Sequence, residues 1–108
     1  MADTPDRQLA HIVFFDLKED SADTRQTLIA AAQSYLSGHD GTVYFSVGEI
    51  GDGFDRPVND QEFAVALHVV FENRAAHDVY QTHERHLAFI EEQKSNWNRV
   101  RVFDSYLA

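Results

Sequence analysis

The chain has no cysteine among its 108 residues, which excludes disulfide bonds and thiolate metal sites. It is also poor in positive charge: 9 lysines and arginines stand against 18 acidic residues, leaving a formal net charge of −9. Nucleic acids and anionic membranes attract clustered basic residues, so we expect neither as a partner. No segment approaches the roughly 18 apolar residues of a membrane span, and the polar start lacks the apolar core of a signal peptide. We therefore expect a soluble, cytoplasmic protein.

The length and composition are those of one globular domain. Hydrophobic residues make up 44% of the chain and charged residues 25%, and the length suffices to bury a single core. The sequence predicts a short disordered leader over residues 1–8 and one domain over residues 9–108.

Six segments carry the hydrophobic patterns of strands or helices. Leu9–Leu17 is almost continuously apolar, which is typical of a strand covered on both faces. Apolar residues then recur at helical spacing between Ser21, a good N-cap, and Gly38, which is placed to end the helix. The remaining segments are predicted as a strand over Thr42–Ile50, a loop over Gly51–Gln61, a strand over Glu62–Glu72, a helical region from the N-cap Asn73 to about Ser95, and a strand over Arg99–Leu107.

The order strand, helix, strand, strand, helix, strand indicates an α+β protein of the ferredoxin-like βαββαβ type. This fold has a four-stranded antiparallel sheet with two helices on one face. The other face of such a sheet is left open. Because the strand over Glu62–Glu72 has apolar residues on both of its faces, we expect a second copy of the chain to cover the open face. The sequence thus predicts a homodimer with sheet packed on sheet.

Four motifs together resemble one known family. They are His11-Ile-Val-Phe-Phe15 in the first strand, Val47-Gly-Glu49 before an apolar strand ending in Phe71-Glu72, Tyr80-x-x-His83-x-x-His86-x-x-Phe89, and Val102-Phe-Asp-x-Tyr106. In this order they resemble the stress-responsive A/B barrel domain (Dabb) family of dimeric α+β barrels over roughly residues 9–107. The resemblance implies a homodimer whose two sheets form a barrel, without implying one function.

Members of this family include plant proteins associated with stress tolerance, bacterial proteins of no assigned role, and a cofactor-free cyclase that closes polyketides by aldol chemistry. The positions that match the functional residues of the cyclase are Tyr80, His86 and His11. An imidazole such as His86 suits a general base, and a tyrosine hydroxyl could orient it or polarise a carbonyl. A small apolar molecule would lie between sheet and helices, against residues that we expect to line its site: His83, Val13, Phe15, Leu67 and Phe89.

The chain departs from the family inside its helical motif. The family usually has proline directly after the first histidine, whereas this chain has Glu84. Proline would break the helix, because it lacks an N–H group and clashes with the preceding turn. On an unbroken helix, about 100° per residue would place Tyr80 and His86 about 120° apart. Their pairing therefore requires a break that the sequence does not guarantee.

Three uses of these histidines remain open at this stage. The first is a binding protein of unassigned biochemical role, linked to stress. The second is a cofactor-independent enzyme, of the polyketide cyclase or the monooxygenase kind. The third is a purely structural role. In the structural role His83 or His86 would cap a helix turn or bond a carbonyl, and His11 and His68 would be buried with partners. A metal site built on His83 and His86 would need Glu84 or His11 and still lacks an evident third ligand. We therefore expect neither a metal nor a cofactor.

Overall fold

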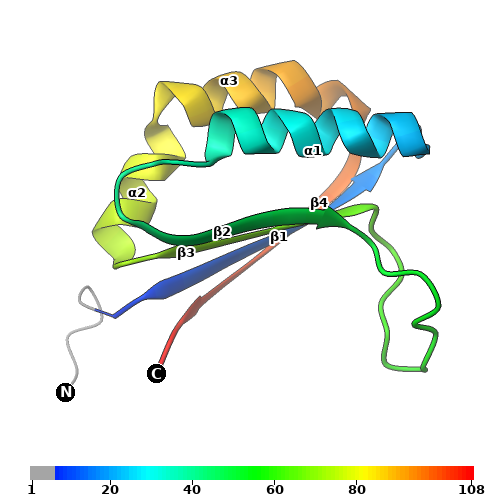
Figure 1. Cartoon of the computed structure of the whole chain (residues 1–108), viewed down its shortest axis with the longest axis horizontal. Coiled ribbons are helices and arrows are strands. Elements are labelled where there is room, and N and C mark those ends of the chain that lie inside the picture. The colour runs from blue at the N-terminus through cyan, green and yellow to red at the C-terminus, as the bar shows by residue number, and fades with distance from the viewer. Residues whose placement is uncertain (1–6) are drawn as a thin grey trace.

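The computed structural model describes residues 7–108, which form a four-stranded antiparallel sheet with the helices stacked on one face (Figure 1). Residues 1–6 of the predicted leader lie outside the described residues. The strand order in the sheet is β2-β3-β1-β4. The elements in chain order are β1 (Leu9–Leu17), α1 (Ala22–Leu36), β2 (Thr42–Glu49), β3 (Val65–Phe71), α2 (Arg74–Thr82), α3 (Glu84–Gln93), a 3₁₀ turn (Lys94–Asn96) and β4 (Trp97–Tyr106).

The central strand β1 pairs antiparallel with β3 on one side and with β4 on the other. Its register sets His11 opposite Val69 of β3 and opposite Asp104 of β4. The predicted ferredoxin-like order of elements is thus confirmed. The last two residues of the predicted leader are held against the C-terminal end of the chain. The Arg7 side chain donates a hydrogen bond to the carbonyl of Leu107, and the N–H of Leu107 donates one to the carbonyl of Gln8.

The third strand is shorter at its start than predicted, because β3 begins at Val65 and not at Glu62. Glu62 and Phe63, before the strand, make other contacts. The carbonyl of Glu62 accepts a hydrogen bond from Arg101 at 3.3 Å, and the ring of Phe63 packs edge-on against Phe14 at 4.9 Å between centroids. The connection after β2 therefore runs from Ile50 to Ala64.

The helix-covered face of the sheet forms the core with α1 and α3. Alternate residues of β1 and β3 are buried there because successive side chains of a strand point to opposite faces. Ser21 caps α1 as predicted, in a reciprocal capping box with Thr24, and Gly38 follows the helix end with a positive φ of 74°. The buried side chains that these elements contribute include Val13, Phe15, Leu17, Leu28, Ala32, Leu36, Val65, Leu67, Val69 and Phe71.

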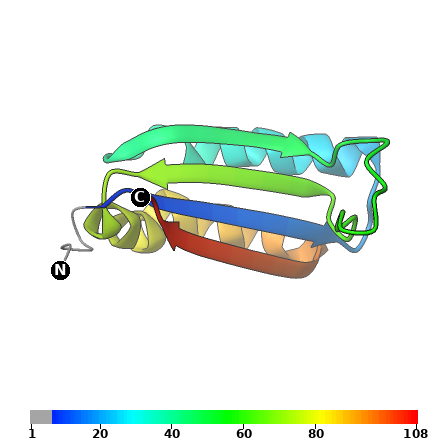
Figure 2. The ribbon, with the colours of Figure 1, turned by 90° about the horizontal axis from the view of Figure 1, so that it is seen from below.

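The opposite face of the sheet is bare, as Figure 2 shows from below. Phe14 lies at its centre, with Phe63 at 4.9 Å and Phe103 at 5.8 Å between ring centroids. Phe103 is 53% exposed and Tyr44 of β2 is 55% exposed. We call this surface, made of the outward residues of the four strands, the open face. Among the described residues, no helix is long and apolar enough to cross a membrane.

Candidate functional site

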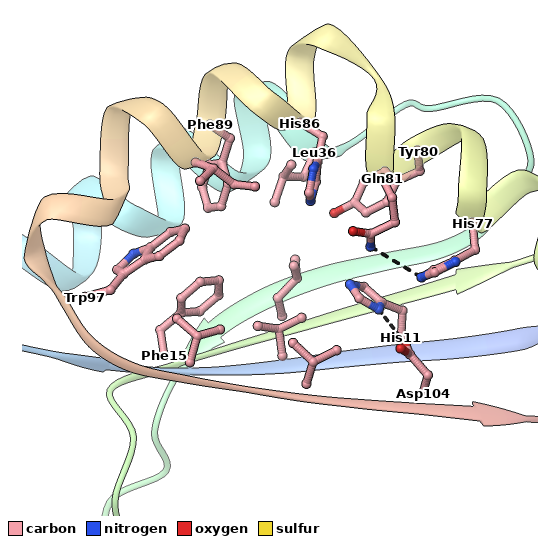
Figure 3. Close-up of a pocket in the computed structure, with 15 residues that line it drawn as sticks. His11, Phe15, Leu36, His77, Tyr80, Gln81, His86, Phe89, Trp97 and Asp104 are labelled. Atoms are coloured by element: carbon pink, nitrogen blue, oxygen red, sulfur yellow. Dashed lines mark hydrogen bonds and ion pairs between the residues drawn. The ribbon is translucent and has the colours of Figure 1, made fainter.

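A cavity of about 360 Å³ lies between the sheet and the helices, and Figure 3 shows the side chains around it. Its volume is within the range of roughly 300–1,000 Å³ that is usual for small-molecule sites. The four apolar residues predicted to contact a ligand are among the fifteen residues that line this cavity. The lining residues are His11, Val13, Phe15, Leu36, Leu67, His77, Tyr80, Gln81, His86, Phe89, Ile90, Trp97, Val100, Val102 and Asp104.

Tyr80 projects from α2 into this cavity, and only 1% of its surface is exposed. Its ring contacts Phe71 at 4.9 Å and His86 at 4.7 Å between centroids. The hydroxyl is buried and has no hydrogen-bond partner within residues 7–108. Burial raises the pKa of Tyr80 well above its ordinary value, so the phenol keeps its proton. The site therefore contains a buried O–H group that is available to hydrogen-bond a ligand.

His86 faces Tyr80 from the first turns of α3, as Figure 3 shows. Its Nδ1 atom is buried and, like the Tyr80 hydroxyl, has no hydrogen-bond partner in the described chain. Burial lowers the pKa of His86, and the backbone carbonyl of Gln81 partly opposes this shift. The neutral imidazole is therefore favoured at neutral pH, which is the form that can accept a proton.

The pairing of Tyr80 with His86 depends on a break between α2 and α3. His83 has an extended backbone, with φ −63° and ψ 141°, and ends one helix while starting the next. The break that the family achieves with proline therefore forms here with Glu84 in that position. The imidazole of His83 caps α3, because its Nδ1 accepts a hydrogen bond of 3.1 Å from the backbone N–H of Arg85.

A second contact holds this break in place from outside the two helices. The Arg85 guanidinium donates hydrogen bonds to the carbonyls of Ser34 at 2.6 Å and Ser37 at 3.0 Å, at the end of α1. These carbonyls are among those that a helix end leaves unpaired. The turn between α2 and α3 is thus tied to α1 by a side chain that the sequence motif does not include.

His83 does not line the cavity, although the sequence predicted it among the ligand-binding residues. Its ring lies on the far side of Tyr80 and packs edge-on against His39 at 4.8 Å between centroids. The reason is the break itself, which turns the His83 side chain back onto its own helix start. Its position agrees with the structural alternative, in which one of the two histidines caps a helix.

His11 lies on the sheet at the floor of the cavity, in β1. Its Nδ1 is 2.5 Å from a carboxylate oxygen of Asp104 on β4, so the histidine has the partner expected of a buried polar group. Burial lowers the pKa of His11, and the hydrogen bond and negative charge of Asp104 oppose the shift. By contrast His68 lies on the open face, partly exposed, and is not part of the core.

Several lining residues were not singled out from the sequence. His77 and Gln81 lie on α2, where they flank Tyr80 at helical spacings of three and one. Asp104 stood only inside the fourth motif, and its place at the cavity follows from the register of β1 with β4. Trp97, which none of the motifs includes, lines the cavity beside Phe15 and Phe89. The alternation of β4 could have revealed Asp104, since it shares a face with Val100 and Val102.

The cavity has one polar end and one apolar end. His11, Tyr80 and His86 lie at the polar end, while Phe15, Phe89 and Trp97 surround the other end (Figure 3). The cavity opens along the outer strand, where Val100 and Val102 line it and are 39% and 50% exposed. Chemically, this arrangement can orient a molecule that has an apolar body and one polar group.

Comparisons with known proteins identify the family and the fold. The family model described as the stress responsive A/B barrel domain (Dabb) matches residues 9–107. A solved structure of a Dabb family protein from Mesorhizobium loti has a TM-score of 0.78 and 21% identity, over 94% of this chain and 98% of that chain. None of the curated protein sequences compared with the chain matches it.

Two further solved structures are similar to this chain. A dimeric ferredoxin-like protein of unknown function from Thermobifida fusca has a TM-score of 0.76 and 15% identity, over 94% of this chain and 92% of that chain. A hydroxynitrile lyase from Passiflora edulis has a TM-score of 0.75 and 19% identity, over 96% of each chain. At these identities the structural likeness shows a common fold alone.

Proposed function

Because the chain belongs to the stress responsive A/B barrel domain (Dabb) family, we propose that it is a homodimer that binds a small, largely apolar molecule between its sheet and its helices. The ligand would place its apolar body against Phe15, Phe89 and Trp97. Its polar group would lie between Tyr80 and His86. A role in a stress response, in keeping with the family description, and a cytoplasmic location belong to the same proposal.

The observation that carries the proposal is a pair of unpartnered polar atoms at one end of a mainly apolar cavity, whose other end holds one further unpartnered group, the Trp97 Nε1–H. A buried donor or acceptor left without a hydrogen bond costs about 1–3 kcal/mol. The Tyr80 hydroxyl and His86 Nδ1 are both in this state within the described residues. A ligand hydroxyl can donate one hydrogen bond and accept another, so it suits both atoms whichever imidazole nitrogen carries the proton. We therefore expect an alcohol or phenol with an apolar body.

The homodimer part of the proposal rests on the open face. Phe14, Phe63 and Phe103 form an aromatic cluster there, and contiguous exposed apolar surface is typical of a protein interface. A similar solved structure, from Thermobifida fusca, is described as dimeric. A second copy of this chain, packed sheet against sheet, would remove the cluster from water.

Binding can be tested with the fluorescence of Trp97, which is the single tryptophan of the chain and lines the cavity. We would titrate the protein with 4-propylphenol and, as a matched control, with propylbenzene, which differs only in the hydroxyl. The proposal predicts saturable quenching or enhancement by both, with the phenol binding about tenfold more tightly, as one or two buried hydrogen bonds provide. Equal affinities, or no saturable change with either compound, would contradict it.

A cofactor-independent enzyme is the second candidate, because Tyr80 and His86 lie 4.7 Å apart between ring centroids beside the cavity. The lowered pKa of His86 keeps the imidazole neutral and able to take a proton next to a carbonyl, while Tyr80 could hydrogen-bond that carbonyl. One similar structure is a hydroxynitrile lyase, which shows that a protein of this fold can be an enzyme.

The enzyme candidate predicts catalysed exchange of the acetophenone methyl protons for deuterium in D₂O, followed by NMR. The His86→Ala variant should lose this exchange by at least about a hundredfold, as is usual for a general base, while keeping its fold. If the exchange rate with the wild-type protein equals the rate in buffer, the result argues against the enzyme candidate. The binding proposal is tested separately, by the fluorescence titration with 4-propylphenol.

A further inference from the structure

We propose that the chain holds a divalent transition-metal cation, of the zinc type, between the imidazoles of His11 and His77 and the carboxylate of Asp104. These three residues come from β1, α2 and β4, which the fold brings together at the polar end of the cavity. One potential ligand atom from each of them lies within 4.8 Å of the others. This site goes beyond the proposed ligand binding and does not depend on it.

The distances fit a cation after a small adjustment. Zinc binds imidazole nitrogen and carboxylate oxygen at about 2.0–2.2 Å, so two ligands on a tetrahedral ion lie roughly 3.3 Å apart. Because the potential ligand atoms lie within 4.8 Å of one another, the most distant pair must approach by about 1.5 Å at most. The Nδ1 of His11 and the carboxylate oxygen of Asp104, now 2.5 Å apart, must separate slightly. The rings of His11 and His77 already lie edge to face, with centroids 5.2 Å apart.

The surroundings of His77 resemble those of a metal-binding histidine. Such a histidine usually donates its second ring N–H to a carboxylate, which fixes the ring and strengthens the ligand. The Nδ1 of His77 is 3.0 Å from a carboxylate oxygen of Asp78, which leaves Nε2 toward the cavity (Figure 3). That Nε2 lies 3.3 Å from the side-chain amide of Gln81, whose oxygen could serve as a further ligand if the amide turned over.

Charge and access also favour a cation at this place. Asp104 brings negative charge and is 41% exposed, so an ion can reach the site from solvent. The chain has no cysteine to compete for zinc, and its formal net charge of −9 attracts cations in general. A cation here would give the cavity a Lewis acid at its polar end.

The test is calorimetric titration of ZnCl₂ into protein that has been stripped with EDTA. We expect one ion per subunit, with a dissociation constant on the order of micromolar. The His77→Ala variant should bind at least about tenfold more weakly, whereas His68→Ala, which removes a histidine from the open face, should bind like the wild type. The proposal is overturned if zinc does not bind at about 100 μM, or if His77→Ala leaves the affinity unchanged.

A second variant separates this site from general attraction to an acidic surface. Asp78 is exposed and lies outside the core, so Asp78→Asn should fold and should weaken zinc binding by about tenfold through the loss of the carboxylate behind His77. The matched control is Asp55→Asn, which makes the same charge change in the exposed connection after β2. Equal losses in both variants would contradict a specific site. Titration of the metal-free protein with 4-propylphenol tests ligand binding separately.

Discussion

On the covered face of the sheet, Val13, Phe15 and Leu67 are buried beneath the helices, whereas on the open face Phe14 lies beside the half-exposed Phe103. The helices above this face contribute polar groups that no described residue satisfies, Tyr80 and His86, beside the cavity. The open face instead presents aromatic rings to solvent. The two faces therefore suit different partners: a small molecule with a polar group on one side, and another protein surface on the other.

The largest expected effect comes from placing a charge on the open face. In a sheet-to-sheet dimer, Phe103→Asp would bury an unpaired carboxylate, which costs several kcal/mol. We therefore expect dissociation into monomers at micromolar concentration, measured by size-exclusion chromatography with light scattering. The monomer should keep its fold, because Phe103 is 53% exposed in the single chain.

The matched control for this change is Val58→Asp, which alters a residue 81% exposed in the connection after β2. This variant should remain dimeric, because Val58 lies outside the sheet. A wild-type protein that elutes as a monomer would contradict the role proposed for the open face, as would a Phe103→Asp variant that remains a dimer.

On the covered face, removing one hydroxyl should affect binding more than stability. Tyr80→Phe deletes a buried group that has no partner in the described chain, so the free energy of unfolding should stay equal or rise. The affinity for 4-propylphenol should fall about tenfold, because the ligand loses a hydrogen bond. Urea unfolding and Trp97 fluorescence measure the two quantities. A large loss of stability with unchanged affinity would assign Tyr80 a structural role.

The contrast between the faces also explains what the sequence could predict. Alternation along β1 and β3 identifies Val13, Phe15 and Leu67 as one face, and a helix above that face follows from the order of elements. Alternation could therefore place these residues, and with them Phe89 on the helix, beside the space between sheet and helices, whereas their contact with a ligand stays a prediction. A family motif, and not periodicity, drew attention to Tyr80 and His86.

Other parts of the site depend on contacts between distant segments. The break at His83 is supported by the Arg85 contacts with the end of α1, which no local pattern contains. An unbroken helix would have kept His83 beside Tyr80 and turned His86 away. Likewise, Asp104 lies beside His11 because of the register between β4 and β1. The ring of His77 contacts the ring of His11 because α2 packs over the sheet.

A smaller effect is expected at the turn that builds the polar end of the cavity. His83→Ala removes the side-chain cap of α3 and should lower the free energy of unfolding by about 1 kcal/mol. His83→Asn should restore most of this loss, because asparagine is a good N-cap residue. Thermal or urea unfolding of the three proteins gives the comparison. Equal stability of the wild type and the alanine variant would show that the Arg85 contacts alone maintain the break.

The smallest effect expected is the response of stability to mild acid. Burial lowers the pKa of His11, His39 and His86 below the ordinary 6.5, so the unfolded chain binds these protons more readily than the folded chain. Their contribution to stability is thus complete above about pH 6.5 and is lost as the pH falls below it. Urea unfolding between about pH 7.5 and 5.5 measures this loss. Stability that stays constant or rises over that range would contradict it.

The most direct test of the central claim is an NMR pH titration of the His86 ring, assigned with His86→Ala and repeated in Tyr80→Phe and with bound 4-propylphenol. The claim is that His86 and Tyr80 form a buried pair whose free groups face a ligand. It predicts a His86 pKa below the ordinary 6.5 that changes both in the Tyr80→Phe variant and on addition of the phenol. A His86 that titrates like a free imidazole, and responds to neither change, would contradict it.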